Sequence, residues 1–567
     1  MQYSDSLPAH NAESLLVHFR RVELLKQQAT EFKSISLNPH QLCDLEMLLS
    51  RAYYPLDGYM CRDDYERVLD SMKLADGTGW PLPICLGVDE GFAKSLEKGE
   101  CVGVRDAEGF MLAVLTVSEV WQPDLEQEAK AIWGDVSQAD GVNASLSTLE
   151  NPWYVGGRVE GLAFPQRYDF TDIRLTPAEV HRYFSQKGWR KVVGVQAGRP
   201  LHQADRAMLE EIANEEGASV LLSPLMFPSM YSSVDHFTLV RCMQEFVGTF
   251  PRNKALLNLM PWFERKMGPK GALLRAIVNK NYGCTHMLVW DSGKAEPRLN
   301  VLTDEFQEHI DWLDKQQENT GIIPIKERCM VLDDESKKFV SSDDGKLCAN
   351  DHNGIVSLLT QGKEVPEWMS FPGVLETLGK TYKPPSKQGF CLFFTGLSGA
   401  GKSTMAKVLY VKMLELNDRP VTLLDGDIVR TNLSSELDFS KEHRNLNVTR
   451  IGFVASEIVK NGGIAVCAPI APYSESRRQV REAVEQYGGF VEVHVSTPLE
   501  VCEQRDRKGI YAKARAGIIK GLTGVDDPYI EPQNPELRID TSELVPSEAA
   551  YVVLNFLRSS GYVGRGE

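Results

Sequence analysis

One glycine-rich segment, at residues 396–404, constrains the fold of this chain more than any other feature. It reads Gly-Leu-Ser-Gly-Ala-Gly-Lys-Ser-Thr and fits the pattern G-x-x-x-x-G-K-[ST]. An apolar run at residues 390–394 precedes it and a helical pattern at residues 405–416 follows it. Strand, glycine-rich turn and helix in this order place backbone N–H groups and the positive end of a helix dipole around phosphate oxygens. The segment therefore predicts a nucleoside triphosphate site.

The residues of this phosphate loop have separate expected roles. Lys402 can reach the β- and γ-phosphates and is a predicted catalytic residue, and the Ser403 hydroxyl can ligate Mg²⁺. The predicted nucleotide-binding residues of the loop are Gly396, Ser398, Gly399, Ala400, Gly401, Lys402, Ser403 and Thr404.

Length, charge and cysteine usage limit the remaining possibilities. The chain has 567 residues, enough for about three or four domains. A formal net charge of −16 argues against general binding to nucleic acid or anionic membranes, so an anionic substrate needs a local cluster of Arg and Lys. The eleven cysteines are irregularly spaced, and neither a signal peptide nor an 18-residue apolar span is visible. We therefore expect a cytoplasmic protein in a reducing compartment.

A change in composition divides the chain near residues 380–388, where lysines and two prolines predict a linker. After it, apolar runs at 390–394, 421–424, 464–468 and 491–495 alternate with helical patterns, as in a doubly wound parallel sheet. Before it, residues 1–150 have short segments broken by Gly and Pro, which favours a mainly β domain. Residues 165–330 return to an α/β pattern, with strands expected at 192–195, 218–222 and 287–290 and a helix at 204–214.

Three further motifs follow the phosphate loop. Asp425-Gly426-Asp427-x-x-Arg430 comes at the end of a predicted strand, where one carboxylate can orient a metal-bound water and another can accept a proton. Phe439 is followed by Arg444, Asn447 and Arg450 at helical spacing, which suits an anionic nucleotide. Residues 505–529 are rich in Lys, Arg and Gly, as in a mobile lid over phosphates. Each motif also has a purely structural alternative. The first can be a turn with a helix cap, the second a solvated helix face, and the third a solvated loop.

Together, the motifs between residues 389 and 562 resemble those of adenylylsulfate (APS) kinase. The resemblance implies transfer of the ATP γ-phosphoryl group to the 3′-hydroxyl of APS, which yields 3′-phosphoadenylylsulfate (PAPS), with Mg²⁺ as cofactor. It implies a catalytic role for Asp427 and an ATP-binding role for Arg505. The implied APS-binding residues are Arg430, Phe439, Arg444, Asn447, Lys508 and Leu522. The family usually has Phe at the position of Leu522, so one stacking face of the adenine site is missing.

Residues 30–380 resemble ATP sulfurylase, which makes APS from ATP and sulfate. Motifs such as Tyr54-Pro55-Leu56-Asp57-Gly58-Tyr59 and Tyr154-Val155-Gly156-Gly157 match that family. The resemblance implies a PUA-like N-terminal domain, a nucleotidyltransferase domain and self-association through this region into a homo-oligomer.

The centre of the sulfurylase-like region differs from the family pattern Gln-x-Arg-Asn-Pro-x-His-x-x-His. The altered or retained positions of this degenerate site are Gln196, Gly198, Arg199, His202, Asp205 and Trp290. The sulfate-binding Arg of the family is replaced by Gly198, and the second His by Asp205, a carboxylate that would repel phosphates. The second motif, Gly-Arg-Asp-His-Ala, is replaced by residues 290–294, Trp-Asp-Ser-Gly-Lys. Because losing one positioned donor costs roughly 10²–10³ in rate, we expect little sulfurylase activity.

The sequence thus predicts an α/β multidomain enzyme that acts on ATP and APS and binds neither nucleic acid nor membrane. We expect a β-rich PUA-like domain at 1–164, an inactive nucleotidyltransferase domain at 165–330, a small subdomain and linker at 331–387, and a P-loop kinase domain at 388–567. Two alternatives stay open. The chain can be a bifunctional enzyme that also makes APS, or its N-terminal half can be a regulatory nucleotide-binding module.

Overall fold

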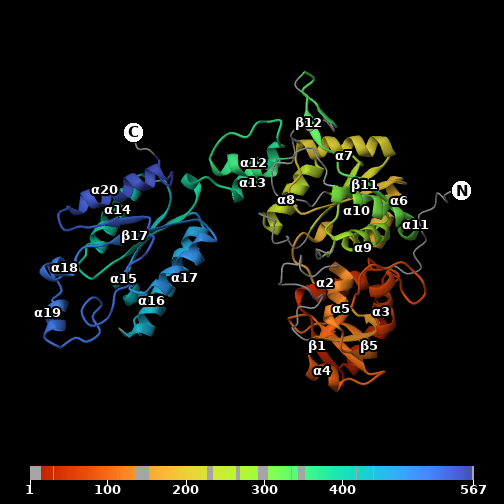
Figure 1. The fold of residues 1–567 in the computed structure, drawn as a ribbon, viewed down its shortest axis with the longest axis horizontal. Helices are drawn as coiled ribbons and strands as arrows, with labels where there is room; N and C mark the ends of the chain where they lie inside the picture. Colours follow the sequence, from red (N-terminus) through yellow and green to blue (C-terminus); the bar gives the residue numbers. More distant parts are fainter. Residues whose placement is uncertain are drawn as a thin grey trace. The chain divides into compact units, whose positions relative to one another are not determined.

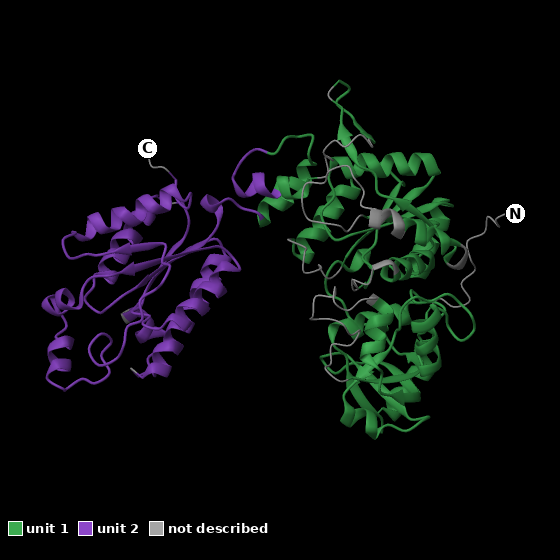
Figure 2. Cartoon of the chain, viewed as in Figure 1, with its two compact units in different colours: residues 1–355, 365–381 green, residues 356–364, 382–567 purple. Residues whose placement is uncertain are grey.

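The computed structural model divides the chain into two compact units (Figures 1 and 2). One unit comprises residues 1–355 and 365–381, and the other comprises residues 356–364 and 382–567. The structure describes residues 14–29, 31–133, 152–225, 234–262, 268–290, 304–333, 335–341, 351–416, 418–438 and 440–564.

The first unit begins with a six-stranded sheet in which neighbouring strands follow the order β1-β4-β5-β6-β2, and β3 also pairs with β6. The pairing is antiparallel except between β1 and β4. The elements of this part are α1 (Phe19–Gln28), β1 (Lys33–Ser36), α2 (Pro39–Leu49), β2 (Gly58–Tyr59), α3 (Arg62–Ser71), β3 (Leu86–Val88), α4 (Glu90–Ser95), β4 (Cys101–Arg105), β5 (Met111–Trp121), α5 (Leu125–Trp133) and β6 (Trp153–Gly161).

A five-stranded parallel sheet, ordered β11-β10-β7-β8-β9, follows in the same unit. Strands β7, β8 and β10 are buried along their whole length, as expected for a parallel sheet that is covered on both faces. The elements are α6 (Pro177–Lys187), β7 (Val192–Ala197), α7 (Gln203–Glu216), β8 (Ser219–Pro224), α8 (His236–Val247), β9 (Ala255–Leu257), α9 (Gly268–Asn281), β10 (His286–Val289), α10 (Asp304–Lys315), α11 (Gln317–Thr320) and β11 (Ile323–Lys326).

The segment that follows consists of a short antiparallel hairpin and two helices. They are β12 (Met330–Leu332), β13 (Phe339–Ser341), α12 (His352–Thr360) and α13 (Pro372–Thr381). Lys380 and Thr381 of the predicted linker therefore belong to a helix, and residues 385–387 form a single 3₁₀ turn. Pro384 and Pro385 fix an extended entry into that turn, after which the next strand begins.

The second unit is built on a parallel sheet ordered β15-β16-β14-β17-β18, with β14 at its centre. Its elements are β14 (Phe390–Thr395), α14 (Lys402–Leu416), β15 (Val421–Asp425), α15 (Gly426–Asn432), α16 (Lys441–Lys460), β16 (Ile464–Ala468), α17 (Ser474–Glu485), β17 (Gly489–Val495), α18 (Leu499–Arg505), α19 (Ile510–Arg515), β18 (Leu537–Ile539) and α20 (Pro546–Ser559).

Alternate side chains of β14 pack into two different layers of this unit. Leu392 and Phe394 join the apolar cluster formed with α14 and α20, whereas Cys391 and Phe393 join the cluster formed with α16 and α17. Figure 1 shows these two helix pairs on opposite faces of the sheet. The arrangement is the doubly wound parallel sheet that the sequence predicts, and it brings the loops that follow β14, β15 and β16 to one edge.

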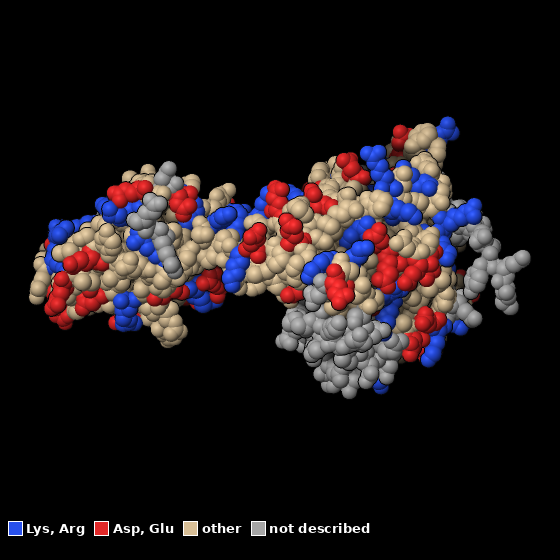
Figure 3. Space-filling model, turned by 90° about the horizontal axis from the view of Figure 1, so that it is seen from above, with Lys and Arg blue, Asp and Glu red and all other residues tan. Residues whose placement is uncertain are grey.

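The surface charges and the cysteines can be compared with the predictions from composition. On the face drawn in Figure 3, acidic and basic side chains are interspersed over the described residues of each unit. Within the part of the chain that the structure describes, no helix is long and apolar enough to cross a membrane. Cysteines such as Cys43 and Cys502 carry free thiols, whereas Cys329 is disulfide-bonded, which the cysteine spacing did not predict.

Candidate active site

The phosphate loop connects β14 to α14, and its backbone requires glycine at three positions. Gly396, Gly399 and Gly401 have φ angles of 146°, 78° and 106°, in the region that side chains disfavour. A Cβ atom on Gly396 would lie 2.4 Å from the carbonyl oxygen of Val495 on the neighbouring strand. The loop therefore has the conformation that turns N–H groups toward an anion at the start of a helix.

Lys402, the first residue of α14, lies folded back over this loop. Its Nζ donates hydrogen bonds to the carbonyl oxygens of Gly396 and Leu397, at 2.8 and 2.7 Å. Burial of the ammonium group lowers the pKa of Lys402 to about 8. Because both acceptors belong to the phosphate loop, the ammonium group is already located where it can exchange these carbonyls for phosphate oxygens.

Ser403 and Asp425 bring two oxygen ligands together beside the loop. The Ser403 Oγ donates to Oδ1 of Asp425 at 2.8 Å, and the same carboxylate oxygen accepts from the N–H of Gly426 at 2.9 Å. A hydroxyl and a carboxylate are ligands that suit Mg²⁺, so this pair fits the ion that accompanies ATP. Asp427 follows two residues after Asp425, in α15, and its side chain is outside the described part of the structure.

Two residues of the basic segment support the phosphate loop, Tyr511 directly and Arg505 through Thr541. Arg505, at the end of α18, donates to Oγ1 and to the carbonyl oxygen of Thr541, at 2.8 and 2.6 Å. Thr541 in turn donates to the carbonyl oxygen of Ala400 at 2.8 Å. Tyr511 of α19 donates its hydroxyl to the carbonyl oxygen of Ser398 at 2.8 Å. The predicted lid therefore packs on the loop, whereas Lys508 is exposed in the turn between the two helices.

Arg444 and Asn447, two of the predicted acceptor-binding residues, lie on α16, where Arg444 contacts residues 521–527. Arg444 donates to Oγ1 of Thr523 at 2.9 Å and also bonds the carboxylate of Asp527 and the carbonyl oxygen of Gly521. Asn447 is buried, and its Oδ1 has no hydrogen-bond partner within the described residues. A buried amide oxygen without a partner can accept a hydrogen bond from a polar ligand group.

The other predicted acceptor residues are only partly brought together. Arg430 donates to the carbonyl oxygens of Leu437 and Asp438, at 3.2 and 3.4 Å, and thus holds the segment that leads to Phe439, which lies outside the described residues. Leu522 is half-buried against the apolar cluster beneath α14 and α20. Arg450, from the same helical stripe, instead donates to the carbonyl oxygen of Leu433 and to Glu436, at 2.9 and 2.5 Å. It therefore ties the end of α15 to α16.

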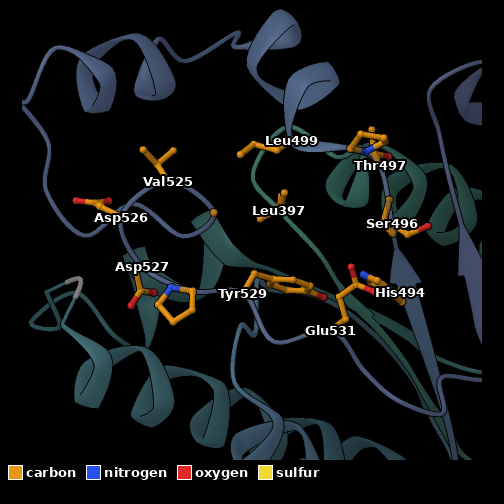
Figure 4. A pocket seen from close by; sticks show the side chains of 14 residues that line it. Leu397, His494, Ser496, Thr497, Leu499, Val525, Asp526, Asp527, Tyr529 and Glu531 are labelled. Atoms are coloured by element: carbon orange, nitrogen blue, oxygen red, sulfur yellow. The ribbon is translucent and has the colours of Figure 1, made fainter.

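A pocket of about 560 Å³ lies beside the phosphate loop, between the end of β17 and residues 524–531 (Figure 4). Leu397 of the loop and the side chains of Asp527 and Tyr529 line it. Neither Thr541 nor Asp527 was among the residues predicted from the sequence. Thr541 follows a short strand and carries no motif. Asp527 is adjacent to Asp526 in the lid segment, and only the structure shows which of the two meets Arg444.

At the sulfurylase-like centre, after β7, the charged groups pair with one another, whereas Oε1 of Gln196 and Nε2 of His352 are buried without a hydrogen-bond partner in the described structure. Arg199 forms a bidentate ion pair with Asp205, with Nη1–Oδ2 and Nη2–Oδ1 distances of 2.9 and 2.8 Å. The Asp205 side chain is fully buried. The ring of Trp290 lies over the Arg199 guanidinium, 5.2 Å from ring centre to Cζ, and its Nε1 donates to the carbonyl oxygen of Gln196 at 2.5 Å. These contacts pair the charges of Arg199 and Asp205 with each other.

His202, retained from the family pattern, also has internal partners. Its Nδ1 lies 2.8 Å from Oγ of Ser370, and its Nε2 lies 3.0 Å from Nδ1 of His352. Burial lowers the pKa of His202 to about 3 and that of His352 to about 4, so both rings are neutral at pH 7. The predicted site residues of this region therefore do lie together, but in a closed arrangement. Gly198, where the family has an Arg, contributes no side chain to it.

Comparison with known proteins gives the same succession of domains. Family models match a PUA-like domain at residues 9–163, ATP-sulfurylase at 171–381 and adenylylsulphate kinase at 388–540. Sulfate adenylyltransferase from Phaeosphaeria nodorum is 38% identical over 552 residues, covering 96% of this chain and 96% of that protein. The enzyme of the same name from Mycosarcoma maydis is 38% identical, covering 95% and 96%. The solved hexameric APS kinase from Thiobacillus denitrificans is 36% identical, covers 97% of this chain and 98% of its own, and has a TM-score of 0.77.

Proposed function

Because the chain belongs to the sulfate adenylyltransferase family and carries both an ATP-sulfurylase and an APS kinase domain, we propose that it transfers the γ-phosphoryl group of ATP to the 3′-hydroxyl of APS. The observation that carries this proposal is the phosphate loop, in which Lys402 rests on the carbonyls of Gly396 and Leu397 while Ser403 meets Asp425. Phosphoryl transfer depends on positioning and on compensation of negative charge, and these groups provide both.

The residues of the donor side have distinct tasks in this reaction. The N–H groups of the loop hold the phosphate oxygens, and the Lys402 ammonium group compensates the charge between the β- and γ-phosphates. Ser403 and Asp425 would hold Mg²⁺, which when bound supplies further positive charge at the same oxygens. Arg505 bonds Thr541, and Thr541 bonds the carbonyl oxygen of Ala400, so the two residues hold this part of the phosphate loop in place. Asp427 accepts the proton of the attacking hydroxyl.

On the acceptor side, α16 and the lid bind APS. Arg444 contributes a cationic fork to the anionic part of APS, and Asn447 contributes an unpaired buried oxygen. Arg430 keeps the segment before Phe439 in place so that the aromatic ring can stack on the adenine, while Leu522 covers the opposite face. Lys508, in the exposed turn of the lid, adds positive charge on closure.

A matched pair of lysine variants tests the kinase proposal. We expect Lys402→Ala to abolish PAPS formation from ATP and APS, because Lys402 supplies the ammonium group that lies on the loop carbonyls. Lys407→Ala, an exposed position on the same helix, should leave the rate unchanged. PAPS and ADP are measured together by chromatography, and circular dichroism verifies that both variants fold. Near-normal turnover of Lys402→Ala at saturating ATP would reject the role of the phosphate loop.

For the sulfurylase domain, we propose that it no longer makes APS and acts as a scaffold. Attack of sulfate on the α-phosphorus of ATP needs a cation for sulfate and donors for the phosphates. Gly198 provides no side chain, and the guanidinium of the adjacent Arg199 is bound to Asp205 and covered by Trp290. Opening a buried ion pair leaves a carboxylate uncompensated, which costs roughly 3–5 kcal/mol. The closed pair therefore supports loss of activity.

The competing proposal is a bifunctional enzyme that both makes and phosphorylates APS. It is favoured by the name of the full-length relatives, sulfate adenylyltransferase. The two proposals differ in one quantity, the sulfate-dependent release of pyrophosphate from ATP. The scaffold proposal expects none, and the bifunctional proposal expects release with the chain unmodified.

A further inference from the structure

The carboxylate of Asp527 connects three segments around the acceptor side of the kinase domain. It pairs with the guanidinium of Arg444 on α16. It accepts the hydroxyl proton of Tyr473, which follows β16, at 3.0 Å to Oδ1 and 2.9 Å to Oδ2. Thr523 lies at 3.5 Å from Oδ2 and shares the same Arg444 nitrogen. This carboxylate is thus the common acceptor for two donors on separate elements.

The backbone around Asp527 is held by other bonds. The N–H of Ile530 donates to the carbonyl oxygen of Pro472 at 2.9 Å. The Tyr529 hydroxyl bonds Oγ1 of Thr395 at 2.9 Å, and the N–H of Gly524 donates to the Asp527 carbonyl oxygen at 2.7 Å. Loss of the carboxylate charge therefore leaves the path of the chain fixed, and an effect of that loss is expected on Arg444 rather than on the fold.

The fork of Arg444 is only partly used by these contacts. Nη1 donates to Thr523 and Asp527, and Nη2 donates one hydrogen to the carbonyl oxygen of Gly521. The guanidinium also interacts with the hydroxyl of Tyr473, and the N–H donors that are left over can bind an anion. A long side chain without a fixed partner loses rotamer freedom when it binds a ligand, and Asp527 removes most of that freedom in advance.

Asp527 also lines the same pocket as a residue of the phosphate loop. Figure 4 shows Asp527 and Tyr529 on the wall of the pocket that includes Leu397 of the phosphate loop. Tyr529 bonds Thr395, the last residue of β14, directly before Gly396. One short segment thus contacts both the arginine of the acceptor side and the strand that enters the donor loop.

We propose that Asp527 is a positioning residue for the acceptor nucleotide: it orients Arg444, with Tyr473, toward the anionic part of APS. This inference rests on the proposed function, since it requires Arg444 to contact APS. Asp527 touches no reacting atom. The Asp527 carboxylate holds the Arg444 side chain in one conformation, so that the planar guanidinium is oriented before APS binds.

The test is steady-state kinetics of Asp527→Asn in the full chain, with ATP and APS varied separately. Asn keeps the size of the side chain but removes its charge. We expect KM for APS to rise on the order of ten-fold, because a charge-assisted bond is weakened, and KM for ATP to stay within about two-fold. Asp527→Glu should restore part of the affinity. Glu482→Gln is the control for loss of a carboxylate charge, since Glu482 is exposed on α17 and pairs with Arg478 rather than with Arg444.

A double-mutant cycle with Arg444→Ala separates this inference from the proposed function. Asp527→Asn should add no further rise in KM for APS once Arg444 is absent. An equal rise in both backgrounds, an unchanged KM, or a lowered KM would overturn the positioning role. If Arg444→Ala itself leaves KM for APS unchanged, the acceptor role of Arg444 fails and the inference fails with it. Should Asp527→Asn not fold, Tyr473→Phe removes one bond to the same carboxylate, and it must raise KM for APS without changing KM for ATP.

Discussion

At the scale of single residues, the charge of Lys402 should make ATP use by the phosphate loop depend on pH. Burial lowers the pKa of this ammonium group to about 8, so the free enzyme loses the positive charge as the pH rises through that value. We therefore expect kcat/KM for ATP to fall about ten-fold per pH unit above pH 8, since this parameter reports groups of the free enzyme.

The measurement is the pH dependence of kcat/KM for ATP at saturating APS between pH 6.5 and 9.5. Thermal melting of the enzyme across the same range serves as the control for unfolding. Lys402→Arg keeps its charge throughout, so any activity that this variant retains should not decline at alkaline pH. A flat profile of the unmodified enzyme up to pH 9.5 would contradict the assignment of Lys402.

How far single residues could be predicted depends on whether their partners are local. The glycines of the phosphate loop act through their own backbone angles, and the motif identifies them. Asp205 was predicted to repel phosphates, but the structure shows that its charge is compensated by Arg199. The pairing requires the turn after β7 to bring position 199 over the start of α7. Asp527 was missed because it lies in a loop, where no periodicity indicates which of two adjacent carboxylates points inward.

At the scale of elements, the start of α7 depends on neutral histidines. His202 and His352 have pKa values lowered to about 3 and about 4 by burial, against an ordinary value of 6.5. Their rings face each other beside Ser370 and the Arg199–Asp205 pair. Between pH 6.5 and about 4, the unfolded chain binds protons that the folded chain does not. The stability of the first unit is therefore full above pH 6.5 and decreases as the pH falls toward 4.

Scanning calorimetry from pH 7.5 to 4.5 measures this dependence. We expect the transition of the first unit to move to lower temperature on acidification, and His352→Asn, which keeps a polar partner for His202, to move less. Addition of ATP identifies the kinase transition, because a bound ligand stabilises only the unit that binds it. Equal acid sensitivity of the variant and the unmodified chain would show that other groups cause the effect.

Elements with strong local signals could be predicted well. The strand expected at 464–468 is β16 to the residue, and the expected helix at 204–214 lies within α7. Strand ends were less accurate: β17 begins at Gly489, two residues before the expected 491, because glycine has no apolar side chain to mark a buried strand. The helices that accompany the N-terminal sheet, such as α2 and α3, were not predicted, because the segment is rich in Gly and Pro and was expected to be mainly β.

At the scale of the whole molecule, the chain joins an APS kinase domain to an ATP-sulfurylase domain in which Arg199 and Asp205 pair with each other. The unit boundary at Thr381 lies in the segment from 380 to 388 where the composition changes. Domain succession could be predicted because each domain has its own motifs. Whether an altered centre still binds substrate depends on the partners of Arg199 and Trp290, which only the tertiary structure provides.

The most direct test of this account is a paired product assay on one preparation of the full chain. With ATP, Mg²⁺, sulfate and pyrophosphatase, phosphate release should not exceed that of a sulfate-free control. With ATP, Mg²⁺ and APS, the same preparation should form PAPS and ADP in equal amounts, and Lys402→Ala should form neither. Release of pyrophosphate that depends on sulfate would contradict the scaffold role of the first unit, and absence of PAPS would contradict the kinase assignment of the second.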